Sequence, residues 1–174
     1  MPEVGDRLPG SGHRAATIQG DMMVESMPFD DAPQLSWLAS LIAARSPGEV
    51  AGLIVALVQD RPGGPAACVL WRLRDRAGCR SVPPTSIDTA DWPWLELAAS
   101  SDVPQWHADR CRVALRLCEL PEPALVVLRL RPWSANERLL ADLLVPLRLA
   151  GQHLQRALEW IELQHSHQQL GRSE

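Results

Sequence analysis

The sequence predicts an α+β domain: an antiparallel sheet with N- and C-terminal helices on one face and an irregular helical cap on the other. Two kinds of hydrophobic periodicity support this prediction. Apolar residues recur at helical spacing in 34–45, 47–60 and 134–169, but they follow strand patterns in 66–74, 110–119 and 124–130. The intervening stretch 83–109 is rich in Trp, Pro, Ser and Asp, and short helices and loops fit it best.

Two helices are expected before the sheet. Leu35, Leu38 and Leu41 fall at helical spacing in the first. Ser46 has the side chain of an N-cap, and Pro47 suits the first turn of the second helix because its missing N–H would be unsatisfied there anyway. The run 61–64 (RPGG) ends that helix.

The strands are expected to form two hairpins, one from 66–82 and one from 110–130. Because successive side chains of a strand point to opposite faces, alternation separates an apolar face from an arginine-rich face. The arginines expected to share these faces are Arg72 and Arg74; Arg110, Arg112 and Arg116; and Arg129 and Arg131.

The C-terminal helix carries a heptad pattern, with apolar residues at alternating steps of three and four. At about 1.5 Å per residue, 134–169 would span roughly 50 Å, more than a small domain needs. We therefore expect a coiled-coil homodimer, with Leu140, Leu147, Leu154 and Ile161 in its interface. The alternative is a single amphipathic helix lying across its own sheet.

The domain organisation predicted from these patterns has three parts. Residues 1–32 form a flexible leader without sustained periodicity, 33–163 form the domain, and 164–174 begin a coiled-coil linker.

Composition argues against several functions. The net charge of −4 argues against a nucleic-acid surface, and no uninterrupted apolar stretch is long enough for a membrane span. The N-terminus lacks the apolar core of a secretory signal, so a cytoplasmic protein is predicted. We find no nucleophile elbow, P-loop, paired-carboxylate pattern or metal-ligand spacing, and therefore expect neither an enzyme nor a metal site.

The arginine-rich face is the candidate ligand site. The forked guanidinium group of Arg matches the geometry of anionic groups such as phosphate, and Trp rings can stack on a flat molecule. The sequence therefore suggests a small anionic ligand such as a nucleotide. The candidate ligand-binding residues are Arg72, Trp92, Trp94, Trp106, Arg112 and Arg116. In the alternative, the arginines pair with the five acidic residues of 83–109 or simply point into water, and the Trp side chains only hold the cap on the sheet.

The order of elements and the closing segment ERLLADLLVPLRLAGQHLQRALEW, with Pro146 inside the helix, resemble the end of a GAF domain. The specific part of the likeness is 110–161, and PAS domains have similar closing helices. The resemblance implies a regulatory module of a bacterial signalling protein that dimerises through terminal helices and binds a small ligand between sheet and cap. The chain departs from cyclic-nucleotide-binding members, whose signature contains a Lys, because it has no Lys.

The function predicted on this basis is that of a non-catalytic sensory and homodimerisation domain without a cofactor. Its C-terminal helix would pass a signal to an output domain beyond Glu174, such as a cyclic-di-GMP cyclase or phosphodiesterase. A ligand-free structural dimerisation module and the sensory domain of a transcription regulator are the alternatives.

Overall fold

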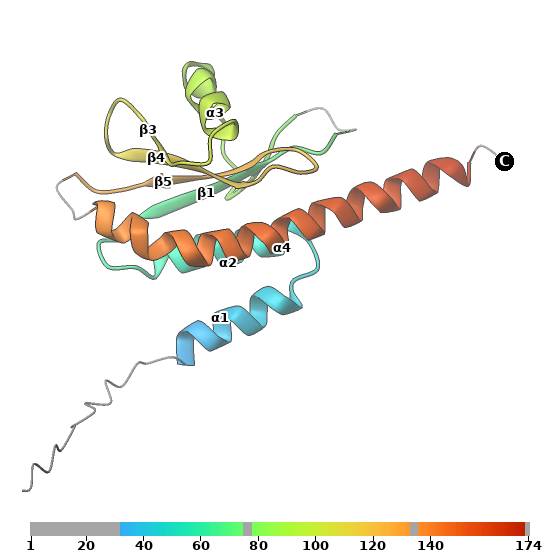
Figure 1. Ribbon diagram of the computed structural model, residues 1–174, viewed down its shortest axis with the longest axis horizontal. Coiled ribbons are helices and arrows are strands. Elements are labelled where there is room, and N and C mark those ends of the chain that lie inside the picture. The colour runs from blue at the N-terminus through green and yellow to red at the C-terminus, as the bar shows by residue number, and fades with distance from the viewer. Residues whose placement is uncertain (1–31, 75–77, 133–135, 173–174) are drawn as a thin grey trace, which may run out of the picture. The chain divides into compact units, whose positions relative to one another are not determined.

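A computed structural model describes residues 32–74, 78–132 and 136–172, so the predicted leader lies almost wholly outside the described residues. The helices are α1 (Ala32–Ala43), α2 (Pro47–Gln59), the 3-10 turn η1 (Thr89–Asp91), α3 (Trp92–Ala99) and α4 (Asn136–Leu170). The strands are β1 (Ala66–Trp71), β2 (Arg80–Val82), β3 (Gln105–Trp106), β4 (Arg112–Cys118) and β5 (Ala124–Arg129). The predicted α+β class is confirmed (Figure 1).

The five strands form one antiparallel sheet in the order β2-β1-β5-β4-β3. β1 and β5 pair along their length, with Val69 opposite Val126. On its other side β5 pairs with β4, with Leu128 opposite Val113. These four valine and leucine side chains are buried in the same core cluster, which identifies one face of the sheet. Both predicted hairpins are present.

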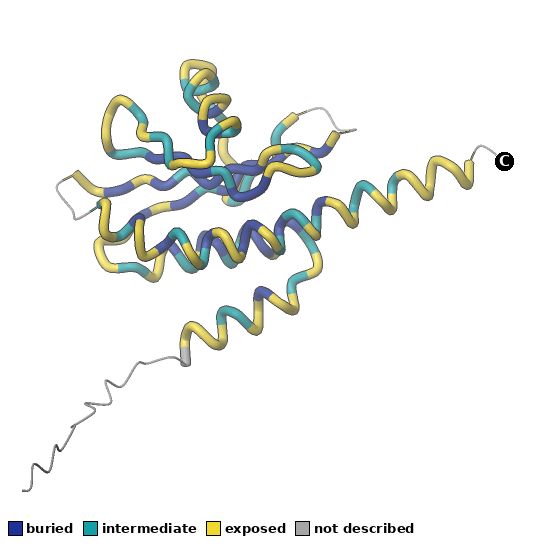
Figure 2. Tube along the Cα trace, viewed as in Figure 1, coloured by how far each residue is buried: buried dark blue, intermediate teal, exposed yellow. Residues whose placement is uncertain are grey.

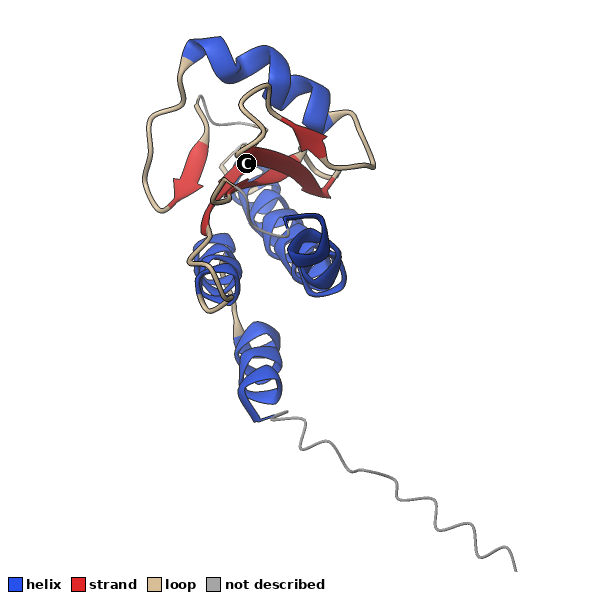
Figure 3. Cartoon of the chain, turned by 90° about the vertical axis from the view of Figure 1, so that its left-hand side faces the viewer, coloured by secondary structure: helices blue, strands red, loops and turns tan. Residues whose placement is uncertain are grey.

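α2 and α4 cover that face side by side (Figure 3). The N-terminus of α2 forms as predicted, because the Ser46 hydroxyl accepts a hydrogen bond from the Glu49 amide at 3.2 Å. α4 approaches the sheet closely at Gly151, where an added Cβ would collide with the backbone carbonyl of Leu117. A side chain at 151 would therefore push α4 away from β4.

α3 lies on the opposite face of the sheet from α2 and α4 (Figure 1). Leu95 and Ala98 of α3 pack there against Leu70, Ala114 and Leu125 of three strands. The predicted three-layer arrangement of helices, sheet and cap is therefore present.

The predicted coiled-coil dimer interface is wrong for three of its four residues. Leu140, Leu147 and Leu154 are buried in the core of the chain itself, with Leu154 fully inaccessible, and Ile161 packs against the edge of the same core. The heptad pattern thus fits the alternative of an amphipathic helix on its own sheet. The last buried residue of α4 is Leu158, after which the helix is mostly exposed (Figure 2).

None of the described helices is both long enough and apolar enough to cross a membrane.

Candidate functional site

The sheet arginines nearest the cap are held by cap carboxylates. Arg112 of β4 donates a hydrogen bond to Asp91 at 2.6 Å and another to Asp109 at 2.7 Å. Arg116 pairs with Asp102 and donates to the Ala99 carbonyl at 3.2 Å. The alternative expectation, that arginines of the sheet neutralise acids of the cap, is confirmed at Arg112 and Arg116.

His107 and Trp94 complete the cluster around Arg112. The His107 ring lies 3.0 Å from Asp109 and 3.4 Å from Asp91, and its centroid is 5.0 Å from that of Trp94 in an edge-to-face arrangement. The Trp94 indole donates a hydrogen bond to the Gln105 carbonyl at 3.1 Å. These contacts assign Trp94 and Arg112 to holding the cap on the sheet.

The pKa of Asp109 reflects this cluster. Partial desolvation acts to raise it, but the hydrogen bonds from the Arg112 side chain and from the Cys111 and Arg112 amides outweigh that effect and lower the pKa to about 2. The Asp109 carboxylate correspondingly raises the pKa of Arg112. Asp109 and Arg112 therefore form an ionised pair at neutral pH.

Arg72 and Trp92 lie at a different place, which we call the cap pocket. This cavity of about 220 Å³ lies between α3, the C-terminal end of β1 and the start of β5. Leu70, Leu95 and Leu125 are buried residues of its lining, and the Arg72 guanidinium carbon lies 6.0 Å from the centroid of the Trp92 ring. The remaining lining residues are Trp71, Cys79, Ile87, Glu96, Ala99, Glu122 and Pro123.

Sequence reasoning missed Glu96 and Glu122 as lining residues of this pocket. One signal was available, because Trp92, Glu96 and Ala99 occur at helical spacing and so share one face of α3. Glu122 comes from the turn between β4 and β5, and no local pattern marks it.

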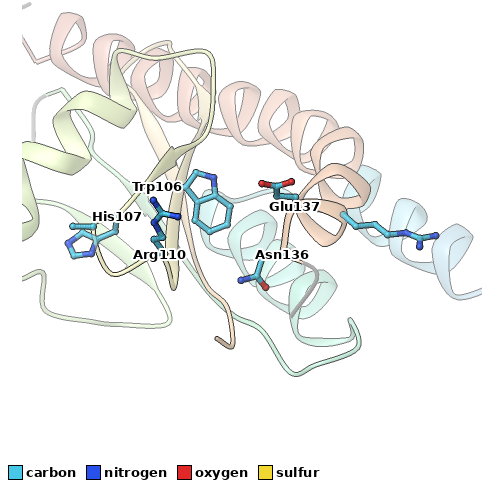
Figure 4. Close-up of a pocket in the computed structure, with 7 residues that line it drawn as sticks. Trp106, His107, Arg110, Asn136 and Glu137 are labelled. Atoms are coloured by element: carbon cyan, nitrogen blue, oxygen red, sulfur yellow. The ribbon is translucent and has the colours of Figure 1, made fainter. Parts of the chain in front are cut away.

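The prediction that Trp106 joins the other Trp side chains is wrong. Trp106 of β3 pairs with Val113, whose side chain lies in the core on the α2 and α4 face, and directly opposed residues share a face. Figure 4 shows the Trp106 ring directed toward Asn136 and Glu137 while His107 points the other way. Trp106 is therefore separated from Trp92 and Trp94 by the sheet.

A second cavity, the edge pocket, lies beside Trp106. It measures about 960 Å³, and Trp106, His107, Ala108, Arg110, Asn136, Glu137 and Arg138 line it (Figure 4). Arg110 was expected in the β4 strand but lies before it, with a positive φ of 56°. Residues 133–135 directly precede Asn136 and lie outside the described residues, so we assign no ligand to this pocket.

Burial makes two of the cysteines poor nucleophiles. Burial raises the pKa of the Cys68 thiol to about 11, with a smaller contribution from Cys79, and burial likewise raises that of Cys118 to about 11. All four cysteines are unpaired. Within the described ranges, no three His, Cys, Asp or Glu side chains are grouped so that they could hold a metal ion.

The candidate site is thus a small cavity between cap and sheet, with Arg72 and Trp92 as its predicted members. No protein-family model, no curated protein and no solved structure matches the chain.

Proposed function

We propose that this chain is a non-catalytic, GAF-like sensory domain of a cytoplasmic bacterial signalling protein. It dimerises through α4 and passes a signal along this helix to an output domain, which the family resemblance suggests is involved in cyclic-di-GMP turnover. The observation that carries the proposal is a group of exposed large apolar side chains, interspersed with polar ones, on the outward face of α4, opposite the one that packs on the sheet.

That outward face is defined by exposed large side chains. Val145 and Leu163 each lie nine positions from the buried Leu154, which is about half a turn around a helix of 3.6 residues per turn. They are 76% and 51% exposed. The exposed apolar residues of α4 are Val145, Leu149, Trp160, Leu163 and Leu170.

α1 adds to the apolar surface. Its Leu41 is fully buried and its Trp37 indole donates to the Leu53 carbonyl of α2 at 2.9 Å, so one side of α1 is held by the domain. Leu35 and Ile42 on the same helix are exposed and seven positions apart, which places them on one face. Exposed large apolar side chains on both helices give a partner helix apolar groups to pack against.

Strand β4 supplies a physical connection between the cap and α4. Arg116 of β4 binds Asp102 and the Ala99 carbonyl on the cap side. The next residue, Leu117, contacts Gly151 of α4 through its backbone carbonyl. A shift of the cap relative to β4 would therefore alter the packing of α4, and α4 continues beyond Leu158 for twelve residues, or about 18 Å.

The test is the mass of the protein in solution, measured by light scattering over a range of concentrations. The wild type is expected to be a dimer, and Leu163→Glu is expected to weaken it at least about tenfold because it places like charges in the interface. Gln164→Glu adds the same charge to the adjacent exposed position and should leave the dimer intact. A monomeric wild type, or a Leu163→Glu variant that dimerises normally, would contradict the proposal.

The second candidate function is a ligand-free structural dimerisation module. It is favoured by Arg112 and Arg116, two predicted ligand residues that are already paired with cap carboxylates. Native mass spectrometry of freshly purified protein separates the two candidates, because a sensory domain should retain or acquire a small ligand and a structural module should not.

A further inference from the structure

The cap pocket carries charged groups of both signs that do not pair with one another. Arg72, Glu96 and Glu122 all line it. Within the described part of the chain, none of the three makes an ion pair. The contrast with Arg112 and Arg116, on the same side of the sheet, is clear, since both of those are bound to carboxylates.

Arg72 contributes the positive charge of the cap pocket. Its guanidinium carbon lies 6.0 Å from the centroid of the Trp92 ring, at the outer limit of a cation–π interaction, and the group carries N–H donors along its edge. The two carboxylates come from α3 and from the turn before β5, so they approach the pocket from different elements than Arg72 does. A cation and two anions are thus arranged around one cavity without contact.

The interior of the pocket is apolar. Leu70, Leu95 and Leu125 are buried, and Ile87 packs against the same cluster. Burial raises the pKa of the Cys79 thiol, which is therefore neutral and adds no charge. The pocket combines an apolar interior with a rim of separated charges.

We propose that the cap pocket binds a free aliphatic α-amino acid, with its carboxylate on Arg72, its ammonium group on Glu96 and Glu122, and its side chain against the buried leucines. This inference rests on the proposed sensory function and names the signal. A zwitterion offers an opposite charge to the guanidinium and to the carboxylates at once, and an aliphatic side chain matches the interior. Hydrogen bonds to ionised groups are the stronger class in proteins, so three such groups give specificity.

The same features argue against the anionic ligand expected from the sequence. One guanidinium and two carboxylates leave the rim with a formal charge of −1, which repels phosphate. The volume of about 220 Å³ is also below the roughly 300–1,000 Å³ typical of pockets for drug-sized ligands, and it suits an amino acid better than a nucleotide.

Calorimetric titration of the purified full chain with L-leucine tests the proposal. Leucine is expected to bind, whereas 4-methylpentanoate, which lacks the ammonium group, and 3-methylbutylamine, which lacks the carboxylate, should each bind about 10- to 100-fold more weakly. Guanosine monophosphate serves as the anionic probe. Absence of leucine binding at millimolar concentration, or equally tight binding of either analogue or of the nucleotide, would overturn the assignment.

Variants locate the site. Arg72→Gln and Glu96→Gln are expected to weaken leucine binding by about tenfold or more, and both side chains are exposed, so the core stays intact. Arg129→Gln and Glu119→Gln make the same chemical changes at exposed residues outside the pocket and should bind leucine like the wild type. Equal binding by all four variants would contradict the site.

Two further measurements distinguish a free amino acid from a peptide N-terminus, and the ligand proposal from the proposed function. The dipeptide Leu-Gly presents the same ammonium group and side chain, and binding as tight as that of leucine would overturn the free amino acid in favour of a peptide N-terminus. Light scattering on the same samples reports the dimer independently. A dimer that does not bind leucine would refute the ligand proposal alone, whereas a monomer would refute the proposed function.

Discussion

Arg112 donates a hydrogen bond of 2.6 Å to Asp91, a residue twenty-one positions earlier in the chain. This contact joins the start of β4, the strand beside the β3 edge, to the beginning of the cap helix, and both side chains are more than three-quarters buried. It shows that an arginine predicted to bind a ligand instead fastens two elements of the fold.

Replacing this arginine should loosen the cap. Arg112→Gln removes hydrogen bonds to Asp91 and Asp109 and leaves partly buried carboxylates without their cation, so we expect a loss of about 1.5–3 kcal/mol in the free energy of unfolding. Urea denaturation measures it. Arg129→Gln, at an exposed position of β5, is the control and should change stability by less than about 0.5 kcal/mol. Equal effects in the two variants would refute the anchoring role.

The pKa of Asp109 predicts a dependence of stability on pH. The folded-state pKa of about 2 lies below the ordinary value of 3.8, so the stabilisation is present above pH 4 and is lost as the pH falls from about 4 toward 2. The Asp109→Asn variant should lack this component, and its urea midpoint should therefore fall less than that of the wild type in this range. Parallel pH profiles of the two proteins would show that Asp109 does not contribute.

A substitution at Leu154 tests whether the heptad face of α4 belongs to the core of the chain or to a dimer interface. Leu154→Ala should reduce the free energy of unfolding by about 2–5 kcal/mol, because the side chain is fully buried and its removal leaves a cavity. Leu163→Ala makes the same change on the exposed face of α4 and should cost far less in a monomeric sample. If Leu154→Ala kept its stability but no longer dimerised, Leu154 would belong to the dimer interface, as predicted from the sequence.

Two glycines should respond oppositely to alanine. Gly151→Ala places a methyl group against the Leu117 carbonyl and should destabilise the protein, even though Ala is the better helix former. Gly52→Ala, in α2, meets nothing within 4 Å and should stabilise it by roughly 0.5–1 kcal/mol. Thermal unfolding of both variants measures the difference, and stabilisation by Gly151→Ala would show that α4 is not tightly apposed to β4.

The general architecture could be predicted because it depends on local patterns. The alternation around Val69, Val113 and Val126 determined which face of each strand is buried, since a strand places successive side chains on opposite sides. Ser46 and Pro47 determined where α2 begins, because capping acts within one turn. The acidic composition of 83–109 indicated correctly that the cap neutralises sheet arginines.

The candidate site was less accessible to prediction. Arg72 and Trp92 were found, and Glu96 shares a helix face with Trp92, but only the fold brings Arg72 and Glu122 to that helix. Trp106 was placed on the wrong face because its orientation depends on pairing with β4, which a two-residue strand does not reveal by alternation.

What the sequence determined by itself was therefore the class of the fold, the faces of its strands and the amphipathic character of α4. Only the tertiary structure decided what covers the heptad face of that helix. The apolar stripe that contains Leu147 and Leu154 must be buried. Because the hydrophobic effect has no preferred direction, the chain's own sheet can cover this stripe as well as a partner helix can. The tertiary structure likewise decided which arginines are neutralised, because ion pairs depend on distances between elements that are far apart in the chain.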